Sequence, residues 1–76
     1  MKEKINKILN EILVSKGGQE KENLNPNLDL RNDLGLDSFD LAELTVKVED
    51  EFGVDIFSNG IVKTLEEIYS IIENEK

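Results

Sequence analysis

Hydrophobic residues near the start of the chain recur with the spacing of an amphipathic helix. Intervals of three and four residues place five aliphatic side chains on one helical face: Ile5, Ile8, Leu9, Ile12 and Leu13. Lysine, asparagine and glutamate fill the remaining positions of this segment, as expected for a solvated face. The sequence Lys16-Gly17-Gly18 then supplies a basic residue followed by glycines, a common helix ending. The pattern predicts a first helix over residues 2–16.

Residues 17–36 lack helical periodicity and contain several residues that favour turns. A connection of this length without structure of its own is unusual in a small domain. Leucines recur along it, and they offer apolar contacts to a helical core: Leu24, Leu28, Leu30, Leu34 and Leu36. We therefore expect a long loop packed against the helices rather than a disordered linker.

The second half of the chain predicts two further helices and a short one between them. Asp37 is a suitable N-cap for a helix that extends to Phe52, and Gly53 ends it. Thr64 and Glu67 have the spacing of a capping box that opens a last helix. Residues 58–62 have room for one short helical turn. The expected fold is all-α, a small bundle of three main helices plus a short fourth helix, in a single domain over residues 1–76.

The second helix has two apolar faces. On a helical wheel one face carries the larger set of apolar positions: Leu41, Leu44, Thr45, Val48 and Phe52. The opposite side carries Phe39, Ala42 and Val46, with acids beside them: Asp40, Glu43, Glu49 and Asp50. A small apolar strip rimmed by charge is typical of a surface that docks a protein partner. The alternative is a central helix with both faces in the core, and the wheel does not decide between them.

The charge balance excludes several classes of function. Seventeen acidic residues stand against nine basic ones, which gives a net charge of −8. Such a chain is repelled by nucleic-acid phosphates and by anionic membranes, so a protein with a basic surface is the more natural partner. The absence of histidine and cysteine removes the usual zinc ligands and the Ser-His pair of hydrolases. No apolar segment is long enough for a signal peptide or a membrane span, so we expect a cytoplasmic protein.

The acidic residues do not form a recognisable metal-binding motif. Asp29, Asp33 and Asp40 have the spacing of three ligands in a calcium-binding EF-hand loop. However, Arg31 occupies another ligand position, and Leu34 stands where that loop requires glycine. We therefore expect no dedicated metal site.

Ser38 lies at the predicted start of the second helix, beside Asp37. The positive end of the helix dipole and the free backbone N–H groups there favour a phosphate attached to this serine. The alternative is that Ser38 is itself the N-cap, a common role for serine. No general base accompanies it, so Ser38 is a poor nucleophile on its own, and any modification requires a second enzyme.

The run from Asp33 to Asp40, Asp-Leu-Gly-Leu-Asp-Ser-Phe-Asp, closely resembles the signature of acyl carrier proteins. The Glu51-Phe52-Gly53 ending of the second helix matches the same family, and the resemblance extends over the whole chain. It implies that a separate phosphopantetheinyl transferase attaches 4′-phosphopantetheine to Ser38, with Asp37 beside the attachment point. It also implies that the second helix is the recognition helix, with Phe39, Ala42 and Val46 as its exposed apolar positions.

The resemblance further implies a carrier rather than an enzyme. The expected partners are acyl-transferring, condensing or ligating enzymes whose basic patches face the acids of the second helix, and the carrier is expected to be monomeric. The candidates for lining an internal acyl pocket are Leu44, Val48, Ile56, Ile61 and Ile68.

The subtype within this family stays open. Fatty-acid carriers usually have leucine or isoleucine where this chain has Phe39, and often proline where it has Phe57. The cargo expected is an acyl intermediate of fatty-acid, polyketide or specialised biosynthesis. One alternative is an aminoacyl cargo such as D-alanine. An alternative of another class is a helix-binding adaptor without any cofactor.

Overall fold

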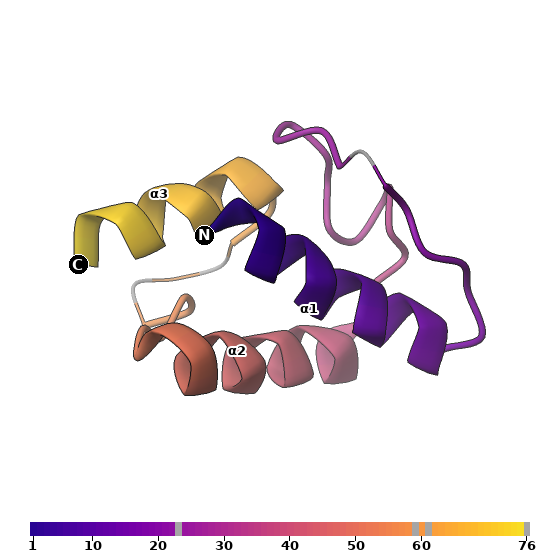
Figure 1. Ribbon diagram of the computed structural model, residues 1–76, viewed down its shortest axis with the longest axis horizontal. Coiled ribbons are helices and arrows are strands. Elements are labelled where there is room, and N and C mark those ends of the chain that lie inside the picture. The colour runs from indigo at the N-terminus through magenta and orange to yellow at the C-terminus, as the bar shows by residue number, and fades with distance from the viewer. Residues whose placement is uncertain (23, 59, 61, 76) are drawn as a thin grey trace.

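Three helices joined by two long connections make up the fold (Figure 1). The computed structural model describes residues 1–22, 24–58, 60 and 62–75. Within them the helices are α1 (Lys2–Ser15), α2 (Ser38–Phe52) and α3 (Leu65–Glu75), and no strand is present. α1 and α2 run in opposite directions, so that the end of α1 lies near the start of α2. The expected all-α fold with three main helices is confirmed.

The predicted short fourth helix is not found in the described part of the connection between α2 and α3. Residues 56–58 form a turn, in which the Asp55 carboxylate accepts a hydrogen bond from the Phe57 amide at 3.0 Å. The Ser58 hydroxyl donates to the Asp55 carbonyl at 3.1 Å. An aspartate that bonds to the backbone two residues ahead competes with helical hydrogen bonding, which explains a turn at this point. Asn59 and Ile61, which belong to the predicted segment, lie outside the described residues.

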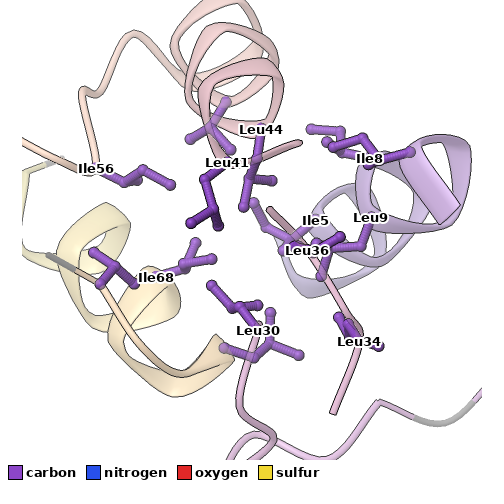
Figure 2. Close-up of a cluster of buried hydrophobic side chains, with 14 of the residues drawn as sticks. Ile5, Ile8, Leu9, Leu30, Leu34, Leu36, Leu41, Leu44, Ile56 and Ile68 are labelled. Carbon is purple, nitrogen blue, oxygen red and sulfur yellow. The ribbon is translucent and has the colours of Figure 1, made fainter. Parts of the chain in front are cut away.

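The apolar faces of the helices meet in one core (Figure 2). The periodic positions of α1 are all buried, as the sequence pattern predicts. From α2 the buried apolar residues are Leu41, Leu44 and Val48, whereas Thr45 and Phe52 are half-buried. α3 adds Leu65, Ile68, Tyr69 and Ile72. Helix α2 therefore buries a single stripe, and its opposite side remains free.

The long connection between α1 and α2 is packed against the helices, as predicted. Its buried side chains are Leu24, Leu30, Leu34 and Leu36, and Leu28 is half-buried. Backbone hydrogen bonds also tie it to the start of α3. The Leu30 amide donates to the Lys63 carbonyl at 2.9 Å, and the Glu66 amide donates to the Pro26 carbonyl at 2.8 Å. Apolar burial and these bonds together hold the segment that leads to Ser38 in a defined place.

Capping residues set the ends of α2. Gly53 takes a left-handed conformation, with φ at 70°, and its amide donates to the Glu49 carbonyl. Glycine adopts such a φ without the steric cost that a Cβ atom brings, so the predicted stop is confirmed. None of the described helices has the length and apolar character needed to cross a lipid bilayer.

Candidate functional site

Ser38 is the first residue of α2 and is exposed to solvent. The N-cap is Asp37, whose carboxylate accepts a hydrogen bond from the Asp40 amide at 2.9 Å. The interpretation of Ser38 as the N-cap is therefore wrong, because Asp37 already fills that role. Ser38 is left as an exposed hydroxyl at the first helical position.

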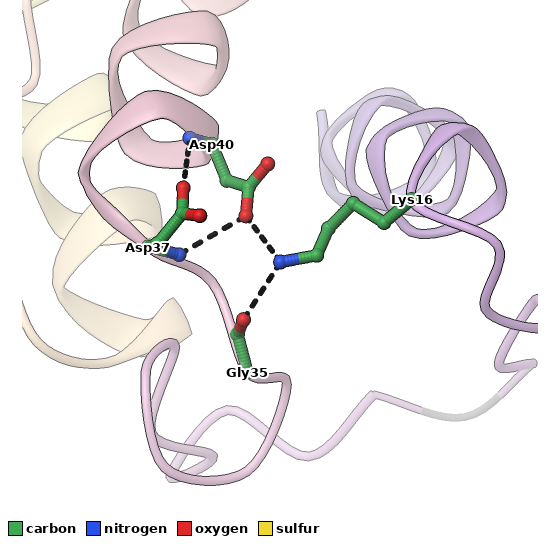
Figure 3. A network of polar contacts seen from close by, with 4 residues as sticks. All are labelled: Lys16, Gly35, Asp37 and Asp40. Carbon is green, nitrogen blue, oxygen red and sulfur yellow. Dashed lines mark hydrogen bonds and ion pairs between the residues drawn. The ribbon is translucent and has the colours of Figure 1, made fainter.

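The first turn of α2 is closed by a reciprocal capping box (Figure 3). The Asp40 carboxylate accepts from the Asp37 amide at 3.0 Å, which returns the bond that Asp37 receives. These two bonds use the amides of Asp37 and Asp40, and the other first-turn amides are those of Ser38 and Phe39. A phosphate on the Ser38 oxygen would lie beside these N–H groups at the positive end of the helix dipole. The local structure thus fits a phosphodiester at Ser38.

Asp40 is the buried charged residue of the described structure, with 8% of its surface exposed. Its carboxylate forms an ion pair with Lys16, whose ammonium group also donates to the Gly35 carbonyl at 2.8 Å. The hydrogen bond from Lys16, followed by that from the Asp37 amide, lowers the pKa of Asp40. The same bond to Asp40 raises the pKa of Lys16. Asp40 was expected to face a partner, and its burial against Lys16 is inconsistent with that expectation.

The second apolar strip of α2 is exposed. Phe39 has 85% of its surface accessible and Val46 has 66%, and Ala42 between them is also exposed. The interpretation that places both faces of α2 in the core is therefore wrong. Three acids on α2 are exposed as well: Glu43, Glu49 and Asp50. We call these three acids and the three apolar residues the acidic docking face.

One basic residue borders the acidic docking face. Lys47 is half-buried, and its ammonium group lies 3.5 Å from the Glu11 carboxylate of α1 and 4.0 Å from that of Glu43. Glu43 is therefore partly neutralised, whereas no ion pair joins Glu49 or Asp50 to another described residue. The negative charge that remains is strongest along the C-terminal half of the face.

The candidate acyl-pocket residues are part of the packed core. Leu44, Val48 and Ile68 have no exposed surface, and Ile56 has 1%. Ile61 lies outside the described residues. The hollows beside α1, Leu41, Val46 and Lys47 are lined by other residues than these four side chains. In this conformation they fill the space that an acyl chain would need.

A cavity of about 410 Å³ lies beside this core, on the side of α2 that carries Leu41. Leu41 follows Ser38 by three residues, so the two lie on neighbouring positions of one helical face. The apolar part of the lining is Leu41, Phe57 and Val62, and the polar part is Asp29, Arg31, Asn32 and Lys63. A larger hollow of about 740 Å³ lies between α1 and residues 20 and 22. The smaller cavity is lined by Leu41, one helical turn beyond the serine, and the sequence pattern does not single out its lining residues as a group.

Lys16 contributes to this site, and no motif in the sequence indicates that it does. Its position before Gly17 indicates only a helix ending, and Lys16 does form the C-cap of α1. Its side-chain contacts are with residues 19 and 24 positions later in the chain. No local pattern indicates contacts at such separations. In the described part of the chain, no cluster of three or more acidic side chains is arranged to hold a metal ion.

Comparison with known proteins identifies the family. The family model for the phosphopantetheine attachment site matches residues 7–72. An acyl carrier protein of Solidesulfovibrio magneticus is 37% identical over 68 residues, which cover 87% of each chain. An acyl carrier protein of Coprothermobacter proteolyticus is 37% identical over 75 residues, 96% of this chain and 92% of the relative. No solved structure matches significantly. With a phosphopantetheine-binding domain over most of its length and these relatives, the chain belongs to the acyl carrier protein family, whose cofactor is covalently attached 4′-phosphopantetheine.

Proposed function

We propose that this protein carries acyl intermediates on a 4′-phosphopantetheine arm attached to Ser38 and delivers them to the enzymes of fatty-acid or related biosynthesis. The observation that carries the proposal is the position of Ser38. Ser38 has an exposed hydroxyl at the start of α2, and this hydroxyl does not cap the helix because Asp37 is the N-cap. The acidic docking face follows Ser38 directly. This arrangement presents a modifiable serine and a recognition surface on the same helix.

The residues around Ser38 have distinct roles in this proposal. Asp37 and Asp40 fix the first turn. The amides of Ser38 and Phe39 would hold the phosphate of the attached group. The arm supplies a terminal thiol, which forms the thioester and which a chain without cysteine cannot provide. Attachment also keeps the cargo at a high effective concentration for a docked enzyme. The chain itself has no histidine or cysteine for turnover, in agreement with a carrier.

The acidic docking face accounts for partner recognition. Glu49 and Asp50 attract basic patches, which raises the rate of encounter and orients the partner. Phe39, Ala42 and Val46 add a small apolar contact that permits rapid dissociation after transfer. We exclude Asp40 from this face because it is bonded to Lys16. Since the attraction is electrostatic, partner affinity should decrease as salt increases, and an affinity independent of salt would contradict this role of the acids.

The cargo has two places to lie in this proposal. The side chains of Leu44, Val48, Ile56 and Ile68 would have to separate to admit an acyl chain, because they are fully packed. The cavity lined by Leu41, one helical turn beyond Ser38, is already open, and in this proposal it receives a short cargo without rearrangement of the core. Acylation should raise the melting temperature if the acyl chain enters the core, and the increase should be larger for longer acyl chains.

The attachment of the cofactor is tested by intact-mass measurement. The wild-type protein, incubated with coenzyme A and a phosphopantetheinyl transferase, should gain the mass of one phosphopantetheine group. Ser38→Ala should gain nothing, whereas Ser58→Ala, which removes another exposed hydroxyl, should behave as wild type. A gain in Ser38→Ala would contradict the assignment. A wild-type protein that gains no mass would favour the helix-binding adaptor.

The cargo is identified by mass spectrometry of the native protein from its host. Acyl chains and aminoacyl groups such as D-alanine give different masses on the same arm. Phe39, which departs from the usual leucine or isoleucine of fatty-acid carriers, is the observation that keeps the aminoacyl cargo as a second candidate. Detection of a D-alanyl thioester in place of a fatty acyl thioester would replace the proposed pathway and leave the carrier role intact.

A further inference from the structure

Lys16 connects three segments of the chain at the start of α2 (Figure 3). It is the C-cap of α1, it donates to the Gly35 carbonyl of the loop at 2.8 Å, and it pairs with the Asp40 carboxylate in the first turn of α2. About a third of the Lys16 side-chain surface, 31%, remains accessible to solvent. The lysine therefore holds the end of α1, the end of the loop and the start of α2 together.

The same oxygen of Asp40 that receives Lys16 also closes the capping box. Asp40 Oδ2 accepts from both Lys16 Nζ and the Asp37 amide. Lys16 thus holds the Asp40 side chain in the rotamer that the capping box requires. Without the ammonium group, a buried carboxylate loses its counter-charge, and it regains solvation by turning toward water. That rotation removes the bond to the Asp37 amide.

Ser38 lies between the two members of this capping box. Asp37 precedes it directly, and Asp40 follows two residues later. Gly35, whose carbonyl Lys16 also holds, lies three residues before Ser38 at a turn with φ of 71°. Fixing these flanking residues fixes the backbone of Ser38 and so the direction of the Cα–Cβ bond that carries its hydroxyl. The residues of the acidic docking face beyond the first turn do not depend on this contact.

We propose that Lys16 is a positioning residue for the modification of Ser38, acting through Asp40 and Gly35 to hold the first turn of α2 in the orientation that presents the hydroxyl to the modifying enzyme. The inference rests on the proposed attachment of the cofactor at Ser38. It predicts that loss of Lys16 affects the chemical step more than docking. In the transfer, the Ser38 oxygen bonds to the coenzyme A phosphorus that carries the pantetheine arm, the hydroxyl proton passes to the modifying enzyme, and adenosine 3′,5′-bisphosphate leaves. This step requires the attacking oxygen within a narrow range of positions, whereas the docking contacts tolerate small shifts.

A second ion pair between α1 and α2 provides a matched control. Lys4 Nζ lies 2.6 Å from the Glu51 carboxylate, near the opposite end of α2. Removing Lys4 therefore breaks an α1–α2 ion pair far from Ser38. Lys16→Met and Lys4→Met each delete one lysine charge and keep an unbranched side chain. They differ in whether the pair holds the first turn of α2.

The experiment measures kcat and KM for phosphopantetheinyl transfer from coenzyme A, with the wild-type apo protein, Lys16→Met, Lys16→Arg and Lys4→Met as substrates. Circular dichroism first establishes that each variant is folded at the assay temperature. Lys16→Met should reduce kcat about tenfold and change KM much less, because the hydroxyl is misplaced while Val46, Glu49 and Asp50, beyond the first turn, keep their positions. Lys16→Arg should restore most of kcat, and Lys4→Met should behave as wild type.

Three results would overturn the inference. They are an unchanged kcat in Lys16→Met, an equal loss in Lys4→Met, and a Lys16→Arg variant as slow as Lys16→Met. Amide hydrogen exchange at Asp37 adds an independent readout, because the Asp37 amide donates to Asp40 Oδ2 and its protection should decrease in Lys16→Met and not in Lys4→Met. Failure of the proposed function is recognised separately, by a wild-type protein that gains no mass. Failure of the inference is recognised by a wild type that is modified and a Lys16→Met variant that is modified equally fast.

Discussion

The exposed apolar residues of α2 allow a quantitative prediction about partner binding. Complete burial of a valine or phenylalanine side chain contributes about 1.5–3 kcal/mol. With 85% of Phe39 and 66% of Val46 available for burial, docking gains at most about 2.5 kcal/mol from Phe39 and about 1 kcal/mol from Val46. Truncation to alanine retains the Cβ methyl group. Phe39→Ala should therefore weaken the free energy of partner binding by about 2 kcal/mol, and Val46→Ala should weaken it by somewhat under 1 kcal/mol. These values correspond to a loss of affinity of about 30-fold for Phe39→Ala and up to about fivefold for Val46→Ala.

The assay is the KM for phosphopantetheinyl transfer, measured together with the unfolding midpoint of each variant. Both side chains already face water, so truncation should change the free energy of unfolding by less than about 0.5 kcal/mol. Val46→Ala isolates docking, because Val46 lies two helical turns from Ser38, whereas Phe39 is its neighbour. Val14→Ala is the matched control, since Val14 is an exposed valine on α1, 49% accessible. A KM for Val46→Ala equal to that of Val14→Ala would refute the docking role of the strip.

Three further predictions concern stability, each measured by urea or thermal unfolding followed by far-UV circular dichroism. Leu44→Ala should lower the free energy of unfolding by about 3 kcal/mol, because Leu44 is fully buried and its truncation leaves a cavity. A decrease no larger than that of Val14→Ala would contradict the place of Leu44 in the core. Gly53→Ala should lower the free energy of unfolding by about 1 kcal/mol, because alanine is strained at a φ of 70°. An unchanged unfolding midpoint would show that α2 ends differently. Acid should destabilise the protein. Lys16 and the Asp37 amide lower the pKa of Asp40, so this contribution to stability is complete above the pKa of an unfolded aspartate, about 4, and is lost as the pH falls through the lower folded-state pKa. Asp40→Asn should lose less stability than the wild-type protein over this pH range. An equal acid dependence in the wild type and in Asp40→Asn would rule out the contribution of Asp40.

The location of Ser38 was predictable because its signals are local. The Asp37 cap and the Gly53 stop lie at the ends of the helix that they define, and they act through the backbone of neighbouring residues. The short fourth helix is absent from the described part of its predicted segment for a related reason. A few turn-forming residues permit either a helical turn or an Asx turn, and the bond from the Phe57 amide to Asp55 selects the latter.

The partner-facing residues were only partly predictable. The helical wheel places Phe39, Ala42 and Val46 on one side of α2, and the structure decides that this side is exposed. Asp40 was grouped with the acids of that side, but it turns inward because Lys16 approaches from α1. A wheel orders the residues of one helix and contains no information about which other element covers a given face.

The sequence by itself determined the helices, the leucine-bearing loop and the serine at the start of α2. Their signals are hydrophobic periodicity and capping, which operate over a few residues. Only the tertiary structure decided that one face of α2 stays in solvent, that Asp40 is buried, and that Lys16 holds it there. These outcomes depend on contacts between residues far apart in the chain. Such contacts form because burial of the common core brings the end of α1 to the start of α2.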